Sequence, residues 1–130
     1  MKVLNPPQWP KPKGYANGIS VNANARMIYT AGVVGWNAEG EFPDDFLGQL
    51  EQALNNTVEI LAQDNALPEH IVRMVWYITD KSAYLQQARE AGALWRSIIG
   101  RHFPAMAVVE VTALMEDAAQ IEIESVAAVE

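Results

Sequence analysis

The chain has 130 residues, of which half are hydrophobic and 19% are charged, a composition typical of a globular protein. It has no cysteine, which excludes disulfides, thiolate metal ligands and a cysteine nucleophile. The formal net charge of -7 makes nucleic acid a poor partner, because affinity for phosphates is built from clustered Lys and Arg. The length predicts one domain over residues 1–130.

The N-terminal segment is rich in proline. Residues 5–14, "NPPQWPKPKG", carry four prolines, and each of them fixes φ and removes a backbone donor, which predicts an extended segment. The N-terminus has no apolar stretch of the kind found in secretory signals. No apolar run approaches the roughly 18 residues needed to cross a bilayer. We therefore expect a cytoplasmic protein that does not interact with membranes.

Two short runs of β-type residues follow. Ile19–Val21 and Met27–Ala31 are joined by "NANA", a polar link typical of a turn, and they predict a hairpin. The next stretch, "GWNAEGEFPDD", contains two glycines and a proline and is expected to be a loop.

A first helix is expected from Asp44 and Asp45, whose carboxylates can accept hydrogen bonds from the free N–H groups of its first turn. Apolar residues then recur at the spacing of a buried helical stripe. The stripe consists of Phe46, Leu50, Leu54, Thr57, Val58 and Leu61.

Ile71–Ile78, "IVRMVWYI", is rich in β-branched and aromatic residues and predicts a strand. Alternation puts Val72, Met74, Trp76 and Ile78 on one face and Ile71, Arg73, Val75 and Tyr77 on the other. Both faces are mostly apolar, so both require cover. For Arg73 a structural ion pair with Glu110, Glu122 or Glu124 is the favoured interpretation, because an unpaired buried charge is costly.

A second helix is expected from Asp80 or Ser82 to about Ile99, with small residues at 88, 91 and 92 that allow close approach to a sheet. Two strands, Ala107–Thr112 and Gln120–Val129, complete an α/β (α+β) chain of order β-β-α-β-α-β-β. Two helices cover one face of such a sheet, so we expect a partner subunit on the other. A monomer with an open apolar face is the less favoured alternative.

General motifs for chemistry are absent: there is no P-loop, no GxGxxG after a strand, no HExxH and no GxSxG. His70 and His102 lie far apart in sequence, and no metal site is expected. Glu122 and Glu124 alternate with isoleucines and share one strand face. They form either a solvated outer face or, at a subunit seam, an acid or base for catalysis.

Two aromatic residues are further candidates. Tyr15 lies between the proline-rich segment and the first predicted strand, where it either covers a ligand or packs in the core. Trp36 is the second candidate, whereas Trp9, Trp76 and Trp95 are interpreted as core or interface residues.

Taken in order, several segments resemble the Rid family of reactive intermediate deaminases, also called enamine/imine deaminases. The resemblance extends from about Gly14 to Val129 and rests on "GYANGI", "MIYTAGVVGWNAEGEF", "QLEQALNNTVEILAQ", "HIVRMVWYITD", "FPAMAVVEV" and "IEIESVA". It implies a chorismate-mutase-like fold and a homotrimer with clefts between subunits. It also implies cofactor-independent hydrolysis of enamines and imines made by pyridoxal-phosphate enzymes.

The resemblance assigns roles to individual positions. Tyr15 matches a tyrosine and Glu122 a glutamate that place substrate and water, and Gly32 matches a glycine lining the cleft. In the family an arginine follows "FPA" and clamps the substrate carboxylate, but here Met106 occupies that position. An asparagine often found on the second helix is replaced by Ala88.

Methionine cannot make the bidentate contact of an arginine. The resemblance therefore implies a deaminase-like hydrolase for a small reactive metabolite other than a simple 2-imino acid. We expect Trp36, Met106, His102 and the backbone near Gly32 and Ala105 to bind it. Arg101 is an alternative anchor. The alternatives are a non-catalytic small-molecule-binding trimer and, with less support, a protein-interaction surface.

Overall fold

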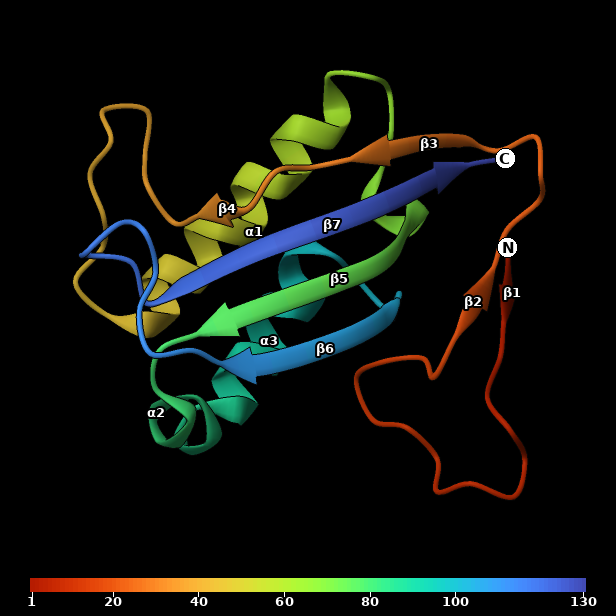
Figure 1. Cartoon of the computed structure of the whole chain (residues 1–130), viewed down its shortest axis with the longest axis horizontal. Coiled ribbons are helices and arrows are strands. Elements are labelled where there is room, and N and C mark those ends of the chain that lie inside the picture. The colour runs from red at the N-terminus through yellow and green to blue at the C-terminus, as the bar shows by residue number, and fades with distance from the viewer.

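The computed structural model describes residues 1–130 and contains a mixed sheet with helices on one face (Figure 1). The strands of the main sheet lie in the order β3 (Arg26–Tyr29), β7 (Ile121–Val129), β5 (Ile71–Ile78) and β6 (Ala105–Glu110), and β4 (Val33–Val34) also pairs with β7. The helices are α1 (Phe46–Ala62), α2 (Lys81–Gln86) and α3 (Ala88–Ile98), with a 3-10 turn, η1, at Pro68–His70. This α+β arrangement confirms the predicted fold class.

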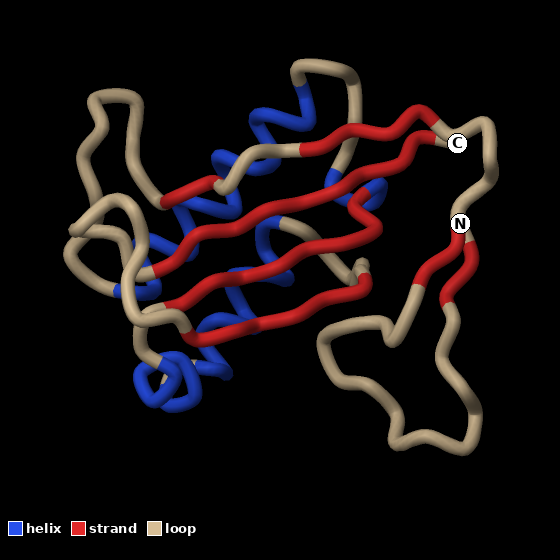
Figure 2. Tube along the Cα trace, in the orientation of Figure 1, coloured by secondary structure: helices blue, strands red, loops and turns tan.

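A small separate sheet stands beside the main one. It consists of β1 (Lys2–Val3) and β2 (Ile19–Ser20), which are antiparallel. Figure 2 shows the long loop between these two strands extending away from the main sheet. This loop contains the four prolines, and the prediction of an extended segment without a helix is confirmed. We call residues 5–16 the N-terminal arm.

The expected order β-β-α-β-α-β-β holds for the main sheet if α2 and α3 are counted as one helical segment, but its first two strands are β3 and β4. The predicted hairpin of Ile19–Val21 with Met27–Ala31 is wrong, because β2 pairs with β1 and β3 pairs with β7. Pairing with β7 sets Ile28 opposite Ala127 and packs it against the core. The two-residue β2 offers no such burial, so tertiary packing overrides the local turn signal.

The start of α1 is as expected. Asp45 is the N-cap, and its Oδ1 accepts a hydrogen bond from the Gly48 N–H at 3.2 Å. Of the predicted stripe, Val58 is half-buried and the other members are buried.

Gln49 is a buried polar residue of α1 that the apolar pattern did not identify. Its Nε2 donates to the carbonyls of Pro43 and Ala118 at 3.0 and 2.9 Å, and its Oε1 accepts from the Gln120 N–H at 2.7 Å. With these bonds made, burial of the amide carries little penalty. Gln49 thereby fixes α1 to the loop that leads into β7.

The central strand β5 is parallel to β6 and antiparallel to β7. An irregularity between Ile71 and Arg73 shifts the register, so that Ile71 joins the core cluster. The prediction that Ile71 and Arg73 share a face is therefore wrong. The predicted ion pair of Arg73 is also not formed, because the chain's two ion pairs are Met1–Glu130 and Arg26–Asp64. Arg73 stays exposed, where water solvates its charge.

The predicted second helix is two helices. Asp80 caps α2, with its Oδ1 accepting from the Ala83 N–H at 3.0 Å. At Gln87 the backbone leaves the helical region, with φ −114° and ψ 17°, and α3 starts at the next residue. The break lets both Tyr84 of α2 and Trp95 of α3 pack against Trp76, with ring centroids 6.1 Å apart in each pair.

The two faces of the main sheet differ in cover. The helices pack on one face (Figure 1), where the side chains of Met74, Ile78, Ile121 and Ile123 are fully buried. No element of the chain covers the other face, which we call the open face. Strand alternation and register place on it Met27, Tyr29, Arg73, Val75, Tyr77, Ala105, Ala107, Val109, Glu122, Glu124 and Val126. None of the helices combines the length and hydropathy required to cross a bilayer.

Candidate functional site

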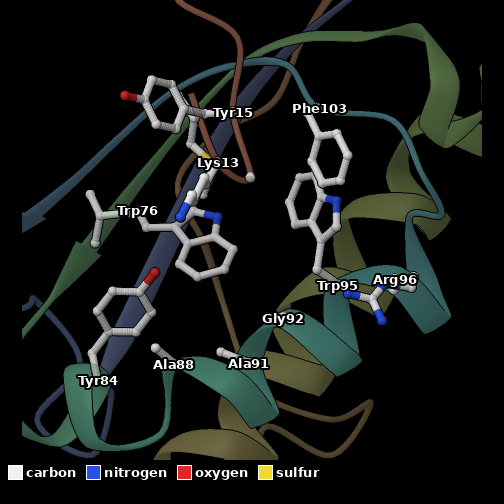
Figure 3. Close-up of a pocket in the computed structure, with 13 residues that line it drawn as sticks. Lys13, Tyr15, Trp76, Tyr84, Ala88, Ala91, Gly92, Trp95, Arg96 and Phe103 are labelled. Atoms are coloured by element: carbon white, nitrogen blue, oxygen red, sulfur yellow. The ribbon is translucent and has the colours of Figure 1, made fainter. Parts of the chain in front are cut away.

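A cavity of about 540 Å³, which we call the aromatic pocket, lies on the helix face of the sheet, between the N-terminal arm, strands β5 and β6, and helix α3 (Figure 3). Most of its wall is apolar. The larger lining side chains are Tyr15, Trp76, Tyr84, Trp95, Phe103 and Met106. Its size lies in the range of small-molecule sites.

The two indoles of the pocket are oriented by hydrogen bonds directed away from it. Nε1 of Trp76 donates to Sδ of Met74 at 3.0 Å, and Nε1 of Trp95 donates to the His102 carbonyl at 3.1 Å. The rings of Trp76 and Trp95 are tilted by 48° to each other. Burial raises the pKa of the Tyr84 hydroxyl, so this group is neutral at physiological pH. The pocket therefore presents aromatic surface and polarisable sulfur to a ligand.

Tyr15 lies at the margin of this pocket. The arm is attached to the sheet next to it, where Ala16 forms a bridge with Ala105 and its N–H donates to the Pro104 carbonyl at 2.9 Å. The Tyr15 side chain is 42% exposed. Of the two interpretations left open by the sequence, packing in the core is therefore wrong.

Met106 and Ala88 both line the aromatic pocket. Met106 lies opposite Met74 in the parallel register and points to the helix face, where it packs against the core cluster. Ala88 is the first residue of α3. The two positions where the resemblance implies an arginine and an asparagine thus form apolar wall.

His102 does not line the pocket. Its Nε2 lies 2.5 Å from the Ile71 carbonyl, and its own carbonyl accepts from Trp95. Arg101 is exposed and also lies outside the lining. In this structure His102 joins the start of β5 to α3, and neither residue lines the pocket.

Glu122 lies on the open face, opposite Tyr77 of β5 and Val34 of β4. Its carboxylate makes no hydrogen bond within the chain, whereas the neighbouring Glu124 accepts one from the Tyr77 hydroxyl at 2.6 Å. That hydrogen bond to the Glu124 carboxylate is the main reason that the pKa of Tyr77 is raised. The two glutamates therefore differ, and Glu122 is the one free to hold a ligand or water.

Gly32 lies directly against Glu122. A Cβ built on Gly32 would be 2.5 Å from Oε2 of Glu122, so only glycine allows this approach. The loop is held in place by Asn56 of α1, whose Nδ2 donates to the carbonyls of Val34 and Trp36 at 3.0 and 2.8 Å. A second, more open hollow of about 670 Å³ borders Gly32 and Trp36. Trp36 is 43% exposed.

The predicted site residues thus form two groups in one chain. Tyr15 and Met106 belong to the aromatic pocket, while Gly32 and Glu122 meet on the open face. Met106 and Glu122 occupy opposite faces of the sheet and pair with residues of β5 that are three positions apart, Met74 and Tyr77. Nor do three or more His, Asp or Glu side chains converge anywhere in the chain as a metal site would require.

Several pocket residues were not recognised as such in the sequence. Trp76 and Trp95 are interpreted above as core or interface residues, and they are buried, yet they also line the pocket. The small residues Ala88, Ala91 and Gly92, which allow the helix to approach the sheet, border the cavity as well, and Ala91 is part of the core cluster. Their small volume opposite two large indoles was the available signal.

Comparison with known proteins places this arrangement in a family. The family model described as Endoribonuclease L-PSP matches residues 10–129. A RutC family protein of Pasteurella multocida is 30% identical over 102 residues, which is 78% of each chain.

Two solved structures are similar over 98% of both chains. A member of the conserved Rid protein family from Yersinia pestis is 30% identical, with a TM-score of 0.85. The YjgF gene product from E. coli is 28% identical, with a TM-score of 0.69. The chain therefore belongs to the Rid family, whose model carries the description Endoribonuclease L-PSP.

Proposed function

We propose that the chain is a cofactor-independent hydrolase of the enamine/imine deaminase type, acting on a small reactive metabolite. One observation carries the proposal: the Glu122 carboxylate lies against the backbone of Gly32, without a hydrogen-bond partner in the chain, on a sheet face that the chain leaves open. A carboxylate in such a place can hold a water molecule and accept its proton.

The reaction proceeds through hydrolysis of a C=N bond. An enamine first takes a proton on carbon and loses one from nitrogen to become an imine, and water then adds to the imine carbon. The C–N bond breaks, the nitrogen leaves as ammonia, and a carbonyl remains, so imine and water give carbonyl compound and ammonia. Glu122 takes a proton from the water and returns one to the leaving nitrogen.

The working site requires two copies of the chain. The aromatic pocket and Glu122 lie on opposite faces of one sheet, so they can face the same molecule only across a subunit boundary. The open face supplies apolar surface for such a boundary, including Tyr29, Val109 and Val126. We infer a homotrimer in which Tyr15 and Met106 of one copy face Glu122 of the next.

The substrate is not a simple 2-imino acid. Hydrogen bonds to charged groups contribute about 1.5–3 kcal/mol. With Met106 in place of the arginine that binds the substrate carboxylate, the affinity for a 2-imino acid is therefore lower by roughly 10- to 100-fold. RNA is disfavoured too, although the family description names an endoribonuclease, because the net charge is -7.

The test is ammonia release from a panel of freshly generated imines and enamines. Glu122→Gln should reduce turnover by about 100-fold or more, the usual contribution of a general base. Glu124→Gln is the matched control, because Glu124 lies two residues along the same strand face and already accepts a hydrogen bond from the Tyr77 hydroxyl. Full activity of Glu122→Gln would show that Glu122 does not have this role.

A non-catalytic binding protein is the second candidate, favoured by the apolar wall at Met106 and Ala88. A thermal-shift screen of small molecules, followed by a turnover assay on each hit, separates the two. Hits that bind in the pocket and are never converted would support the binding protein, and conversion of a hit would exclude it.

A further inference from the structure

Two positive charges border the aromatic pocket. Among its 13 lining residues, Lys13 of the N-terminal arm and Arg96 of α3 are the charged ones, and no Asp or Glu is present. In Figure 3 Lys13 is drawn beside Trp76 and Arg96 beside Trp95. An apolar cavity flanked by cations and free of carboxylates is complementary to an anion attached to an apolar body.

Neither cation is used elsewhere in the chain. The two ion pairs involve Met1 with Glu130 and Arg26 with Asp64, and neither Lys13 nor Arg96 makes a side-chain hydrogen bond. Both side chains are exposed, so they keep their charge and their freedom to turn toward a ligand. An ammonium and a guanidinium together supply the charge-assisted donors that a carboxylate accepts.

The rest of the wall suits a ring. Trp76 and Trp95 are tilted to each other, and Phe103, 39% exposed, is drawn next to Trp95 (Figure 3). Flat aromatic groups gain from such edge and face contacts beyond simple burial. Met106 adds a polarisable sulfur that favours aromatic neighbours.

We propose that Lys13 and Arg96 form a carboxylate anchor at the mouth of the pocket, for a ligand whose aromatic body lies against Trp76, Trp95 and Met106. The anchor is displaced from the position of Met106 to the rim, so the pocket accepts a longer molecule than a simple 2-imino acid. Combined with the proposed deaminase function, on which this step rests, the substrate class is an imine or enamine of an aromatic carboxylic acid.

The test is binding of three probes by isothermal titration calorimetry to the full chain: 3-phenylpropanoate, 3-phenylpropanamide and acetate. The acid should bind roughly tenfold more tightly than its uncharged amide. Acetate, which has the charge without the ring, should bind at least tenfold more weakly than 3-phenylpropanoate. The preference for the acid should shrink as salt is added.

Substitutions locate the anchor. Lys13→Met and Arg96→Met should each lower the affinity for 3-phenylpropanoate by roughly three- to fivefold. The effect of each is modest because both cations are exposed to solvent. The double variant should bind acid and amide equally. The matched controls are Lys11→Met on the same arm and Arg89→Met on the same helix, neither of which lines the pocket. The indole N–H resonances of Trp76 and Trp95 should shift with the acid and confirm the place of binding.

Equal affinity for acid and amide in the wild-type chain would overturn the proposal. It would also be overturned if each variant and its control, Lys13→Met with Lys11→Met and Arg96→Met with Arg89→Met, lost the same affinity for the acid. Absence of binding by all three probes would overturn it as well. None of the three probes carries an imine or enamine, so the outcome of the binding experiment does not depend on turnover. The anchor and the hydrolase can therefore fail separately, the first in the binding experiment and the second in the ammonia assay.

Discussion

The contact between Gly32 and Glu122 joins two residues that are 90 positions apart in the chain. The pairing of β4 with β7 creates it, because this register sets Val34 opposite Glu122 and brings the preceding loop over the carboxylate. The glycine is needed for space, since no left-handed backbone is involved. A single side-chain carbon at this position would move the catalytic candidate.

Gly32→Ala tests this contact. The new Cβ would lie 2.5 Å from Oε2 and 2.6 Å from Cδ of Glu122, so the carboxylate must swing away. We expect ammonia release to fall by about 100-fold, since displacement of a reacting group by about 1 Å has that effect. Thermal unfolding should change little, because the displaced atoms are the end of a flexible side chain.

Gly18→Ala is the control, because its added Cβ would have ordinary contacts with Leu4 at 3.5 Å or more. Gly32→Ala with full activity would contradict the role given to the Glu122 position.

Some residues of the two candidate sites could be predicted from the sequence and others could not. Tyr15 and Glu122 were found because they belong to short motifs that resemble a family. Lys13 and Arg96 were not found, because one lies in a proline-rich arm and the other in a helix more than 80 residues later. Only the folding of the arm onto β6 brings them to one cavity, and no local pattern encodes that proximity.

One aromatic side chain of α2 packs against the core. With six residues, α2 is too short to be stable alone. Its Tyr84 packs edge-on against Phe46 of α1 and Trp76 of β5, with centroid distances of 6.0 and 6.1 Å. Burial of Tyr84 thus connects α2 to the core and closes one side of the aromatic pocket.

The burial of Tyr84 predicts a loss of stability in alkali. Burial raises the pKa of its hydroxyl in the folded chain above the value of about 10 for an exposed tyrosine. The folded state then holds the proton that the unfolded state releases, so the contribution is complete below pH 10 and is lost as pH rises through the folded pKa.

Urea unfolding at pH 8 to 11 checks this prediction. The free energy of unfolding should decline less steeply above pH 10 in Tyr84→Phe than in the wild type. Identical pH profiles would show that Tyr84 is not the cause.

Helices and strands could be predicted from the sequence where the signal lies in neighbouring residues. Asp44 and Asp45 are predicted to open the first helix and Asp80 or Ser82 to cap the second, and the N-caps are Asp45 and Asp80. The hairpin at Ile19–Val21 was wrong because strand partners depend on distant residues. The break at Gln87 was missed because a helical pattern on both sides hides a one-residue departure.

The open face is the side of the main sheet that no element of the chain covers. It combines exposed apolar side chains such as Tyr29, 71% exposed, with the exposed Arg73 and Glu124. The sequence predicted this face from the number of helices alone, and the structure confirms that the chain does not cover it (Figure 1). What covers it depends on other molecules, and the sequence of one chain does not identify them.

Val126→Glu tests the proposed trimer. Val126 lies on the open face opposite Arg73, so the new carboxylate has a partner within one chain and the fold should tolerate it. In a subunit boundary the same charge would be desolvated, which is costly. Multi-angle light scattering should give three times the chain mass of 14.4 kDa for the wild type and mostly one chain mass for the variant.

Met115→Glu is the matched control, because Met115 is 93% exposed in the loop before β7. A wild-type monomer at micromolar concentration would exclude the shared site.

The hydrogen bonds of Asn56 have a consequence for the speed of ligand exchange. They fasten the Gly32 loop to a 17-residue helix, so this half of the site opens only when the helical framework opens. The arm that carries Lys13 and Tyr15 is attached to β6 mainly through Ala16 and consists largely of loop. We therefore expect the arm, rather than the Gly32 loop, to be the part of the proposed site that moves when a ligand exchanges.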